Sequence, residues 1–148
     1  MDRIEFLVRA NPGAEPAPLR KVASGGELSR ISLAIQVILA ADSGVPTLVF
    51  DEVDVGIGGR IAEIVGKRLR EVSGDRQVLC ITHLAQVACQ GNGHILIEKQ
   101  ARRGSSSTSL EQLDVEQRVS EVARMLGGVE ITGATLAHAR EMLELAAQ

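Results

Sequence analysis

The sequence predicts a single α/β domain with a parallel sheet at its core, flanking helices and an antiparallel hairpin in the last third of the chain. Residues 47–50 and 77–81 are apolar runs of the kind found in strands that are buried on both faces. A helical pattern over residues 60–72 lies between them, and strand, helix, strand is the order of a parallel crossover unit. Apolar and polar residues then alternate over 94–99 and 109–113, which predicts the hairpin.

Composition limits the functions that the chain could serve. Residues 1–148, of which 45% are hydrophobic, are enough for one domain with an ordinary core. The formal net charge of -3 gives no overall positive field, so a nucleic-acid contact would need a local basic patch or further parts of the molecule. Cys80 and Cys89 lie in or near apolar segments, which indicates reduced thiols in a cytoplasmic protein. Met1 is followed directly by charged residues, so no signal peptide is predicted. No apolar run is long enough to predict a membrane span.

The first third of the chain is expected to contain a strand, a loop and a helix. Residues 4–9 have strand composition and stop at the turn signal of residues 11–13. Residues 14–19 contain two prolines and are expected to form a loop. Residues 28–41 form a helical segment that is apolar on most sides and is therefore predicted to be largely buried. Its polar residues fall on one side of the helix: Ser29, Ser32 and Gln36.

The remaining elements follow from turn and capping signals. The glycines of residues 56–59 predict a flexible loop before the crossover helix, and a short helix over 84–89 follows the second strand. The hairpin tip, residues 102–107, is rich in serine and is expected to be mobile. Asp114 and Thr132 are suited to cap two closing helices. The apolar stripes of these helices comprise Val115, Val119, Val122, Leu126, Leu136, Ala139, Leu143 and Ala146.

Ser24, Gly25, Gly26 and Glu27 precede the first helix and have two interpretations. In one, Ser24 is the N-cap and Glu27 reaches back to it in a capping box, which is worth about 1 kcal/mol. In the other, the glycines leave the backbone unobstructed, and Ser24 and the free amides of the first turn bind a phosphate. The two roles can coexist, and this stretch alone does not decide between them.

Two acids follow the central strand, and a histidine follows its neighbour. Asp51 and Glu52 lie at a carboxyl strand end, which is the edge of an open α/β sheet where ligands bind. Asp51 could hold Mg²⁺ or its waters, and Glu52 could orient and deprotonate an attacking water. His83 would project to the same edge, where it could hydrogen-bond a terminal phosphate. Taken singly, each of these residues is more often a solvated surface side chain.

Other candidate motifs fail on inspection. The glycines of residues 56–59 are not a dinucleotide-binding motif, because Ile61 stands where the last glycine is required. A calcium loop starting at Asp51 fails at Val53, and Cys80 lies in a predicted strand rather than in a zinc knuckle. No G-x-x-x-x-G-K-[ST] loop occurs in the sequence. The chain therefore has parts for phosphate chemistry without the loop that holds the nucleotide.

Taken in order, these stretches resemble the motifs of ABC-type ATPases. The matches are the signature at 24–27, the Walker B strand at 49–52, the D-loop at 53–54 and the switch histidine at 82–83. Three longer segments resemble the RecN family of bacterial DNA repair proteins, which is related to the SMC and Rad50 ATPases. They are residues 21–30, 50–59 and 81–88. The resemblance covers nearly the whole chain.

The resemblance implies a fold and a set of partners. The chain would be the C-terminal lobe of an ABC-type P-loop ATPase head, and the Walker A lobe would lie in an N-terminal segment that is followed by a coiled coil. Two heads of a homodimer would enclose ATP and Mg²⁺. The complete protein would bind DNA and act in double-strand-break repair and recombination, in the bacterial cytoplasm at the nucleoid and without a membrane. The strand that begins at residue 4 hints at truncation, so the isolated chain is expected to be inactive.

The resemblance also implies a role for each motif residue. Asp51 would serve magnesium, Glu52 would be the catalytic base and His83 would contact the γ-phosphate, all in the head to which they belong. Asp54 would help to couple the two sites. Ser24, Gly25 and Gly26 of the signature would face the nucleotide of the opposite head, and Glu27 would be a further cofactor-binding residue of this stretch.

Two other functions are compatible with the motifs. A non-catalytic interaction module would keep them as a dimerisation surface, and the ATPase half of an ABC transporter would carry the same four. Residues 21–30 and 54–59 fit the repair branch better than a transporter. Arg102 and Arg103 at the hairpin tip could contact DNA or belong to a solvated turn.

Overall fold

Two parallel strands, β3 (Thr47–Phe50) and β4 (Gln77–Cys80), form the centre of the fold and pair along their whole length. Helix α2 (Gly59–Val72) crosses over between them, so the predicted crossover unit is confirmed. In the part of the chain that the structure describes, this parallel sheet has two strands. The computed structural model describes residues 4–9, 13–21, 25–42, 44–51, 54, 56–102, 105–127 and 130–148.

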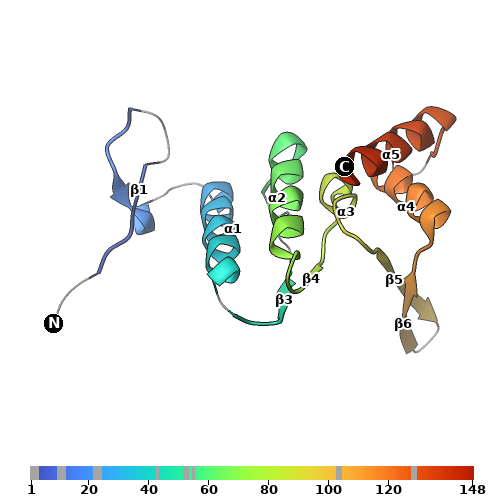
Figure 1. The fold of residues 1–148 in the computed structure, drawn as a ribbon, viewed down its shortest axis with the longest axis horizontal. Helices are drawn as coiled ribbons and strands as arrows, with labels where there is room; N and C mark the ends of the chain where they lie inside the picture. The colour runs from blue at the N-terminus through green and yellow to red at the C-terminus, as the bar shows by residue number, and fades with distance from the viewer. Residues whose placement is uncertain are drawn as a thin grey trace.

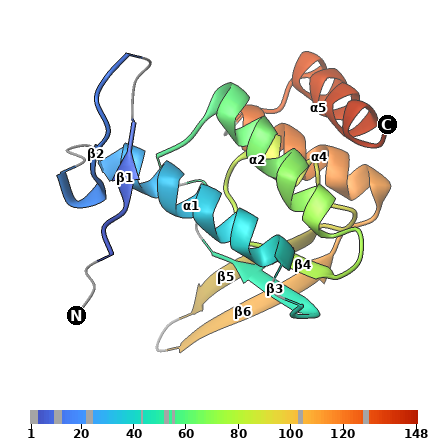
Figure 2. The ribbon, with the colours of Figure 1, turned by 60° about the vertical axis from the view of Figure 1, so that its left-hand side comes forward.

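Helices α1 (Gly25–Asp42) and α2 cover one face of the parallel pair (Figure 2). Alternate residues of a strand point to opposite faces, and Leu48 and Phe50 of β3 point to the helices. The buried residues of this core are Leu33, Phe50, Ala62, Leu69 and Val87. The core therefore joins α1, both strands and α2, and it fixes where the carboxyl ends of the two strands lie.

The other face of the β3–β4 pair is exposed to solvent. The prediction that both strands are buried on both faces is therefore wrong for this chain. Val49 is 63% exposed, and Leu79 and Ile81 are 44% and 49% exposed. The prediction that the first helix is largely buried is also wrong, because Ile38 and Leu39 are 67% and 65% exposed. Burial requires elements packed on each side of a segment, and among the described residues the helices pack on one side of the pair.

A second core lies among α3 (Ala85–Ala88), α4 (Val115–Gly127) and α5 (Gly133–Ala146), at the opposite end of the molecule from β1 (Figure 1). Small residues at the contacts allow these helices to approach closely. Its buried residues are Ala85, Val119, Val122, Ala123 and Ala139. The predicted stripe of α4 thus begins at Val119, because Val115 is 74% exposed.

Both predicted helix caps are present. Asp114 Oδ1 accepts a hydrogen bond from Gln117 N at 2.8 Å, and Asp114 N donates to Gln117 Oε1 at 2.8 Å, which is a reciprocal capping box. Thr132 Oγ1 accepts from Thr135 N at 3.2 Å and caps α5. The two closing helices therefore start where their local sequence signals predict.

The hairpin is longer than predicted. Strands β5 (Ile95–Arg102) and β6 (Ser105–Gln112) pair antiparallel up to Arg102 opposite Ser105, so most of the expected tip is strand. Arg103 and Gly104 lie outside the described residues. Backbone pairing does not require apolar side chains, so a serine-rich stretch can continue the ladder.

The first third of the chain differs from its prediction in the segments that precede α1. Strand β1 (Leu7–Val8) is shorter than the predicted strand and pairs antiparallel with β2 (Ala17–Pro18), which lies in the expected loop. A short helical turn, η1 (Leu19–Lys21), follows. Proline is tolerated in β2 because β2 is an edge strand. A residue whose nitrogen faces away from the partner strand needs no amide hydrogen for the pairing. Of the predicted turn at residues 11–13, only Gly13 is described.

Candidate functional site

The carboxyl ends of β3 and β4 lie side by side, and the motif residues follow them directly. The last pair in the register is Phe50 with Cys80, and Ile81 N then donates to Phe50 O at 2.9 Å. Asp51 therefore begins the segment that leaves β3 next to the segment that leaves β4. The prediction that the acids and His83 share one edge of the sheet rests on this parallel pairing.

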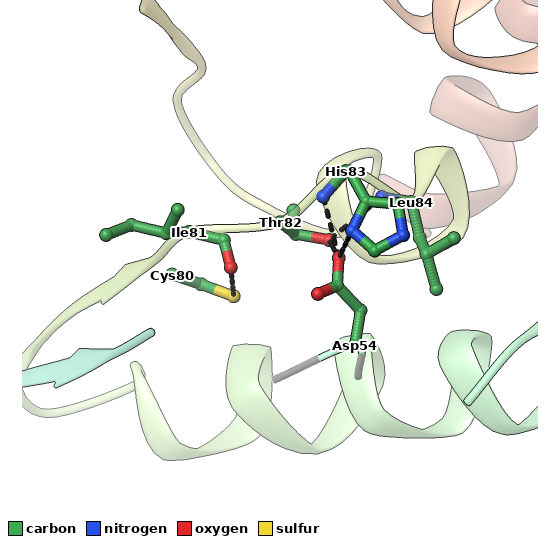
Figure 3. A network of polar contacts seen from close by, with 6 residues as sticks. All are labelled: Asp54, Cys80, Ile81, Thr82, His83 and Leu84. Atoms are coloured by element: carbon green, nitrogen blue, oxygen red, sulfur yellow. Dashed lines mark hydrogen bonds and ion pairs between the residues drawn. The ribbon is translucent and has the colours of Figure 1, made fainter. Parts of the chain in front are cut away.

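Asp54 and His83 are in direct contact (Figure 3). Asp54 is only 3% exposed, and its Oδ2 atom lies 2.6 Å from the backbone N of His83 and 3.0 Å from the ring Nδ1. The same oxygen accepts a hydrogen bond from Thr82 Oγ1 at 2.5 Å. The side chain of His83 is 74% exposed, so its ring reaches from this buried carboxylate out to the surface.

The environment of Asp54 keeps its carboxylate ionised. Burial raises the pKa of Asp54, but the hydrogen bonds from Thr82 and from the His83 backbone, with the nearby imidazole, outweigh burial and bring the pKa below its ordinary value. Thr82 Oγ1 also accepts a hydrogen bond from Leu84 N at 3.0 Å, at the start of α3. Asp54 thus holds the turn between β4 and α3.

The start of α1 touches the loop that follows Asp54. Gly56 has φ of +74°, a conformation that suits glycine, and a Cβ added to it would lie 3.2 Å from the Cα of Gly26. Arg30 of α1 donates from Nη1 to Gly56 O at 3.3 Å. Gly26 belongs to the signature-like stretch and Gly56 to the loop after the acids, so two segments separated in sequence meet here through their backbones.

The structure describes some of the predicted site residues and not others. Asp51 is exposed at the end of β3, and Gly25 and Gly26 form the first turn of α1. Ser24 and Glu52 lie outside the described residues, and of Glu27 only the backbone is described. The described part of the site therefore consists of Asp51, the turn at Asp54, His83 and the start of α1.

Thr82 is the functional-site residue to which the sequence analysis gave no role of its own. It lies between the end of β4 and His83, and its hydroxyl links Asp54 to the first turn of α3. A threonine hydroxyl can accept a hydrogen bond from the backbone N–H two residues on, as Thr82 does from Leu84, and this turn signal could have pointed to it.

Asp51 can be tested as a magnesium ligand by the chemistry of its surroundings. Among the described residues, no group of three or more histidine, cysteine, aspartate or glutamate side chains could together hold a metal ion. Mg²⁺ does not need such a group, because it keeps several waters and is bound by one or two carboxylates together with substrate phosphates. The exposed carboxylate of Asp51 at a strand end fits this kind of binding.

The described helices give no sign of a membrane segment, since none of them combines the length and the apolar character needed to cross a bilayer.

A solved chain from a study of the ATP-driven dimerization and DNA-stimulated activation of SMC ATPases has a similar fold, with a TM-score of 0.60 at 19% sequence identity. The match covers 84% of this chain and 81% of the solved one. The α/β fold is therefore one that an SMC ATPase chain also has.

Sequence comparison identifies much closer relatives, although no family model matches the chain. It is 54% identical to the DNA repair protein RecN of Vibrio cholerae over 96% of its length and 54% identical to RecN of Haemophilus influenzae over 97%. RecN of Bacillus subtilis is 43% identical over the whole chain. Each match covers 26% of the relative. The resemblance expected from the motifs is thereby confirmed: this chain matches the bacterial DNA repair protein RecN over almost all of its residues and spans about a quarter of the length of the RecN proteins that it matches.

Proposed function

We propose that the chain is the C-terminal lobe of a RecN-like ATPase head that acts in DNA double-strand-break repair and recombination. In this proposal, ATP and Mg²⁺ are bound between two heads, and an N-terminal segment with the Walker A loop completes each head. The observation that carries the proposal is the junction of three motif segments. The turn at Asp54 contacts His83 on one side, while Gly56 after it contacts Gly26 at the start of α1 on the other.

The bare apolar surface of the chain supports the need for a further lobe. Val49, Leu79 and Ile81 leave one face of the sheet exposed, and Ile38 and Leu39 leave the outer side of α1 exposed. Burying apolar surface contributes roughly 25 cal/mol per Å², so an uncovered face of this kind favours association with another layer. The Walker A lobe of the same protein is the partner that we propose for it.

Each motif residue has a defined task in this scheme. Asp51 would hold Mg²⁺ through its carboxylate or through bound waters, and the ion would supply positive charge beside the phosphates. Glu52 accepts the proton of the attacking water, and His83 hydrogen-bonds the terminal phosphate. Ser24 and the amides of the first turn of α1 bind the nucleotide of the opposite head, since a helix N-terminus favours an anion.

The order of events follows from where these residues lie. Because the signature segment acts on the nucleotide of the other head, bound ATP joins the two heads. Because Glu52 acts on the nucleotide of its own head, hydrolysis removes the ATP that connects the two heads. We propose that DNA binding requires the complete protein and that this cycle takes place in the bacterial cytoplasm at the nucleoid.

The substitution Glu52→Gln tests the catalytic part of the proposal. In the complete protein it should preserve ATP-dependent pairing of heads while lowering the turnover number by about 10²–10⁴, the usual contribution of a general base. Glu63→Gln is a matched control, because Glu63 forms an exposed ion pair with Lys67 on α2 and belongs to none of the motifs. Turnover of Glu52→Gln close to that of the control would remove Glu52 from the role of base.

The exposed sheet face also favours a second candidate, in which the chain is a non-catalytic interaction module that uses its fold to dimerise. Mixing the chain with a separately produced Walker A lobe and measuring ATP hydrolysis separates the two candidates. Hydrolysis that requires both components supports the ATPase head. Stable association without hydrolysis, at concentrations where the two components are fully bound, supports the interaction module.

A further inference from the structure

We propose that Arg30 is a positioning residue that fixes the turn at Asp54 against the start of α1 and, through that turn, fixes the backbone of His83. The turn is in contact on both sides. Arg30 Nη1 donates to Gly56 O at 3.3 Å on one side, and His83 N donates to Asp54 Oδ2 at 2.6 Å on the other. The positions of these groups follow from the contacts alone, and their consequence for turnover rests on the proposed ATPase function.

The turn at Asp54 connects these two contacts. Ile57 N donates to Asp54 O at 3.2 Å and closes the turn, and Gly56 has a φ of +74°. A positive φ at the third of four turn residues suits glycine, which adopts it without steric cost. The closing hydrogen bond holds the backbones of Asp54 and Gly56 together, so a displacement of the Gly56 carbonyl also moves Asp54.

Two positions of α1 contact the turn, one helical turn apart. A Cβ added to Gly56 would lie 3.2 Å from the Cα of Gly26, so the backbones of these two glycines approach closely. Arg30 follows Gly26 by four residues and therefore lies on the same face of the helix, from which its side chain reaches Gly56 O. The missing side chain at Gly26 admits the turn, and Arg30 then fixes its orientation as well as its distance from the helix.

The other side of the turn leads to His83. Asp54 is 3% exposed, and its Oδ2 atom accepts from Thr82 Oγ1 at 2.5 Å and from His83 N at 2.6 Å. Hydrogen bonds to a carboxylate are short and strong, so the backbone at 82–83 follows the carboxylate when the turn moves. The side chain of His83 is 74% exposed and is carried by this backbone. Its place therefore depends on where the turn lies.

Arg30 thus lies between two parts of the site that have different tasks in the proposed function. In that function the start of α1 binds the nucleotide of the opposite head, and His83 contacts the phosphate of its own head. Among the described residues, Arg30 shares no hydrogen bond or ion pair with His83. An arginine that only stabilised α1 would leave His83 unaffected, so an effect of Arg30 on His83 is specific to this inference.

The backbone amide signal of His83 in NMR tests this effect in the chain itself. Arg30→Met removes the donor to Gly56 O and keeps an apolar stem. We expect the amide proton of His83 to move upfield, because its hydrogen bond to Asp54 Oδ2 lengthens when the turn is released. An unchanged His83 signal in a folded Arg30→Met chain overturns the inference.

Two further arginine substitutions separate this effect from a general loss of stability. Arg30→Lys keeps a charged donor, so the His83 signal should lie closer to its unaltered position than in Arg30→Met. Arg68→Met removes an exposed arginine that pairs with Glu71 within α2, and it should leave the His83 signal in place. A His83 signal that moves as far in Arg68→Met as in Arg30→Met overturns the inference, because the change would then not depend on the turn.

Thr82→Val approaches the turn from its other side and keeps the inference testable if the methionine variant does not fold. It removes one of the donors to Asp54 Oδ2. Because Asp54 is tied to Gly56 through the turn, the amide signals of Gly56 and of Gly26 in α1 should then move. A change confined to Asp54 and residues 82–84 in a folded Thr82→Val chain overturns the inference.

Turnover in the complete protein tests whether the link matters for hydrolysis. Arg30→Met and Thr82→Val should each lower the turnover number for ATP. Because both act through the same turn, the double variant should stay within about twofold of the lower single variant and should not show the product of the two losses. Multiplicative losses overturn the link in hydrolysis. A complete, unaltered protein that does not hydrolyse ATP would instead contradict the proposed function and would leave the signals measured in the chain unaffected.

Discussion

Replacing Arg118 by methionine should destabilise the chain more than replacing an exposed arginine by methionine does. Arg118 of α4 donates from Nη2 to Ala88 O at 3.3 Å, to Cys89 O at 3.0 Å and to Gly91 O, and from Nη1 to Asn92 O at 3.5 Å. These carbonyls lie at and just after the end of α3, where a helix runs out of its own backbone donors, although Ala88 O also accepts from Gly91 N at 3.3 Å. The guanidinium therefore stabilises the end of the helix that begins next to the candidate site.

The size of the effect follows from the charge and burial of these contacts. A hydrogen bond to a charged group contributes about 1.5–3 kcal/mol, and each buried carbonyl left without a partner costs about 1–3 kcal/mol. Burial also opposes the charge, because it lowers the pKa of Arg118, so removing the charge recovers part of the loss. Methionine keeps an apolar stem of similar length. We expect Arg118→Met to lower the free energy of unfolding by about 2–3 kcal/mol.

Urea denaturation followed by far-ultraviolet circular dichroism measures this loss. The matched control is Arg140→Met, because Arg140 is also in the closing helices and forms an ion pair with Glu116 at 2.8 Å between exposed side chains. Such pairs contribute about 0–1 kcal/mol. If Arg118→Met costs no more than Arg140→Met, the contacts to the carbonyls do not stabilise α3 and the reasoning fails.

Three further substitutions give results of known sign. Gly66→Ala should lower the free energy of unfolding by about 1–3 kcal/mol, because its Cβ would lie 2.8 Å from the Cγ of Gln90. The control is Gly133→Ala, whose Cβ would have nothing within 4 Å and which should be neutral or stabilising. Thermal unfolding compares the two variants. Gly56→Ala should lower the free energy of unfolding by about 1–2 kcal/mol from its positive φ alone, which lowers the urea midpoint; a midpoint equal to that of the unaltered chain would contradict the described turn. The folded-state pKa of Asp54 lies below its unfolded value, so its carboxylate stabilises the fold above the unfolded pKa of about 3.9 and this contribution is lost as pH falls through the folded pKa. The stability gap between the unaltered chain and Asp54→Asn should therefore narrow in acid, and an equal gap at neutral and strongly acidic pH would refute it.

Local signals in the sequence predicted the elements that depend on local chemistry. The strand at Thr47–Phe50 is bounded by Pro46 and by an acid, and its limits are those predicted. The cap at Thr132 requires only a hydroxyl and the amides of the next turn, so its prediction is confirmed. Such features are set within a few residues and need no knowledge of the rest of the fold.

Burial could not be predicted in the same way, because it depends on what packs against a segment. Val49 and Ile38 belong to runs that are apolar enough for a position inside a protein, yet both are exposed in this chain. An apolar composition shows that a segment can be buried. Its exposure depends on which other elements of the chain pack against it. The length of the hairpin was missed for a related reason, since the pairing of Arg102 with Ser105 depends on the backbone more than on side chains.

The candidate site was predicted as a set of motifs and not as a set of contacts. The motifs were enough to indicate a resemblance to the RecN family, and the similarity to RecN proteins confirms that resemblance. The contact between Asp54 and His83 could not be read from the sequence, because it depends on the register of β3 with β4 and on the turn after β3. The roles predicted for the site residues stay predictions, and Ser24 and Glu52 lie outside the described residues.

The contact between Gly26 and Gly56 has a consequence for how this site could be exchanged between proteins. Two backbones meet there at a distance that a single added methyl group would disturb, so the shape of each segment depends on the other. A chimera that takes the loop after β3 from a distant ATPase would have to take the start of α1 from the same donor. The two segments would therefore have to be exchanged together, although 29 residues separate Gly26 from Gly56 in the sequence.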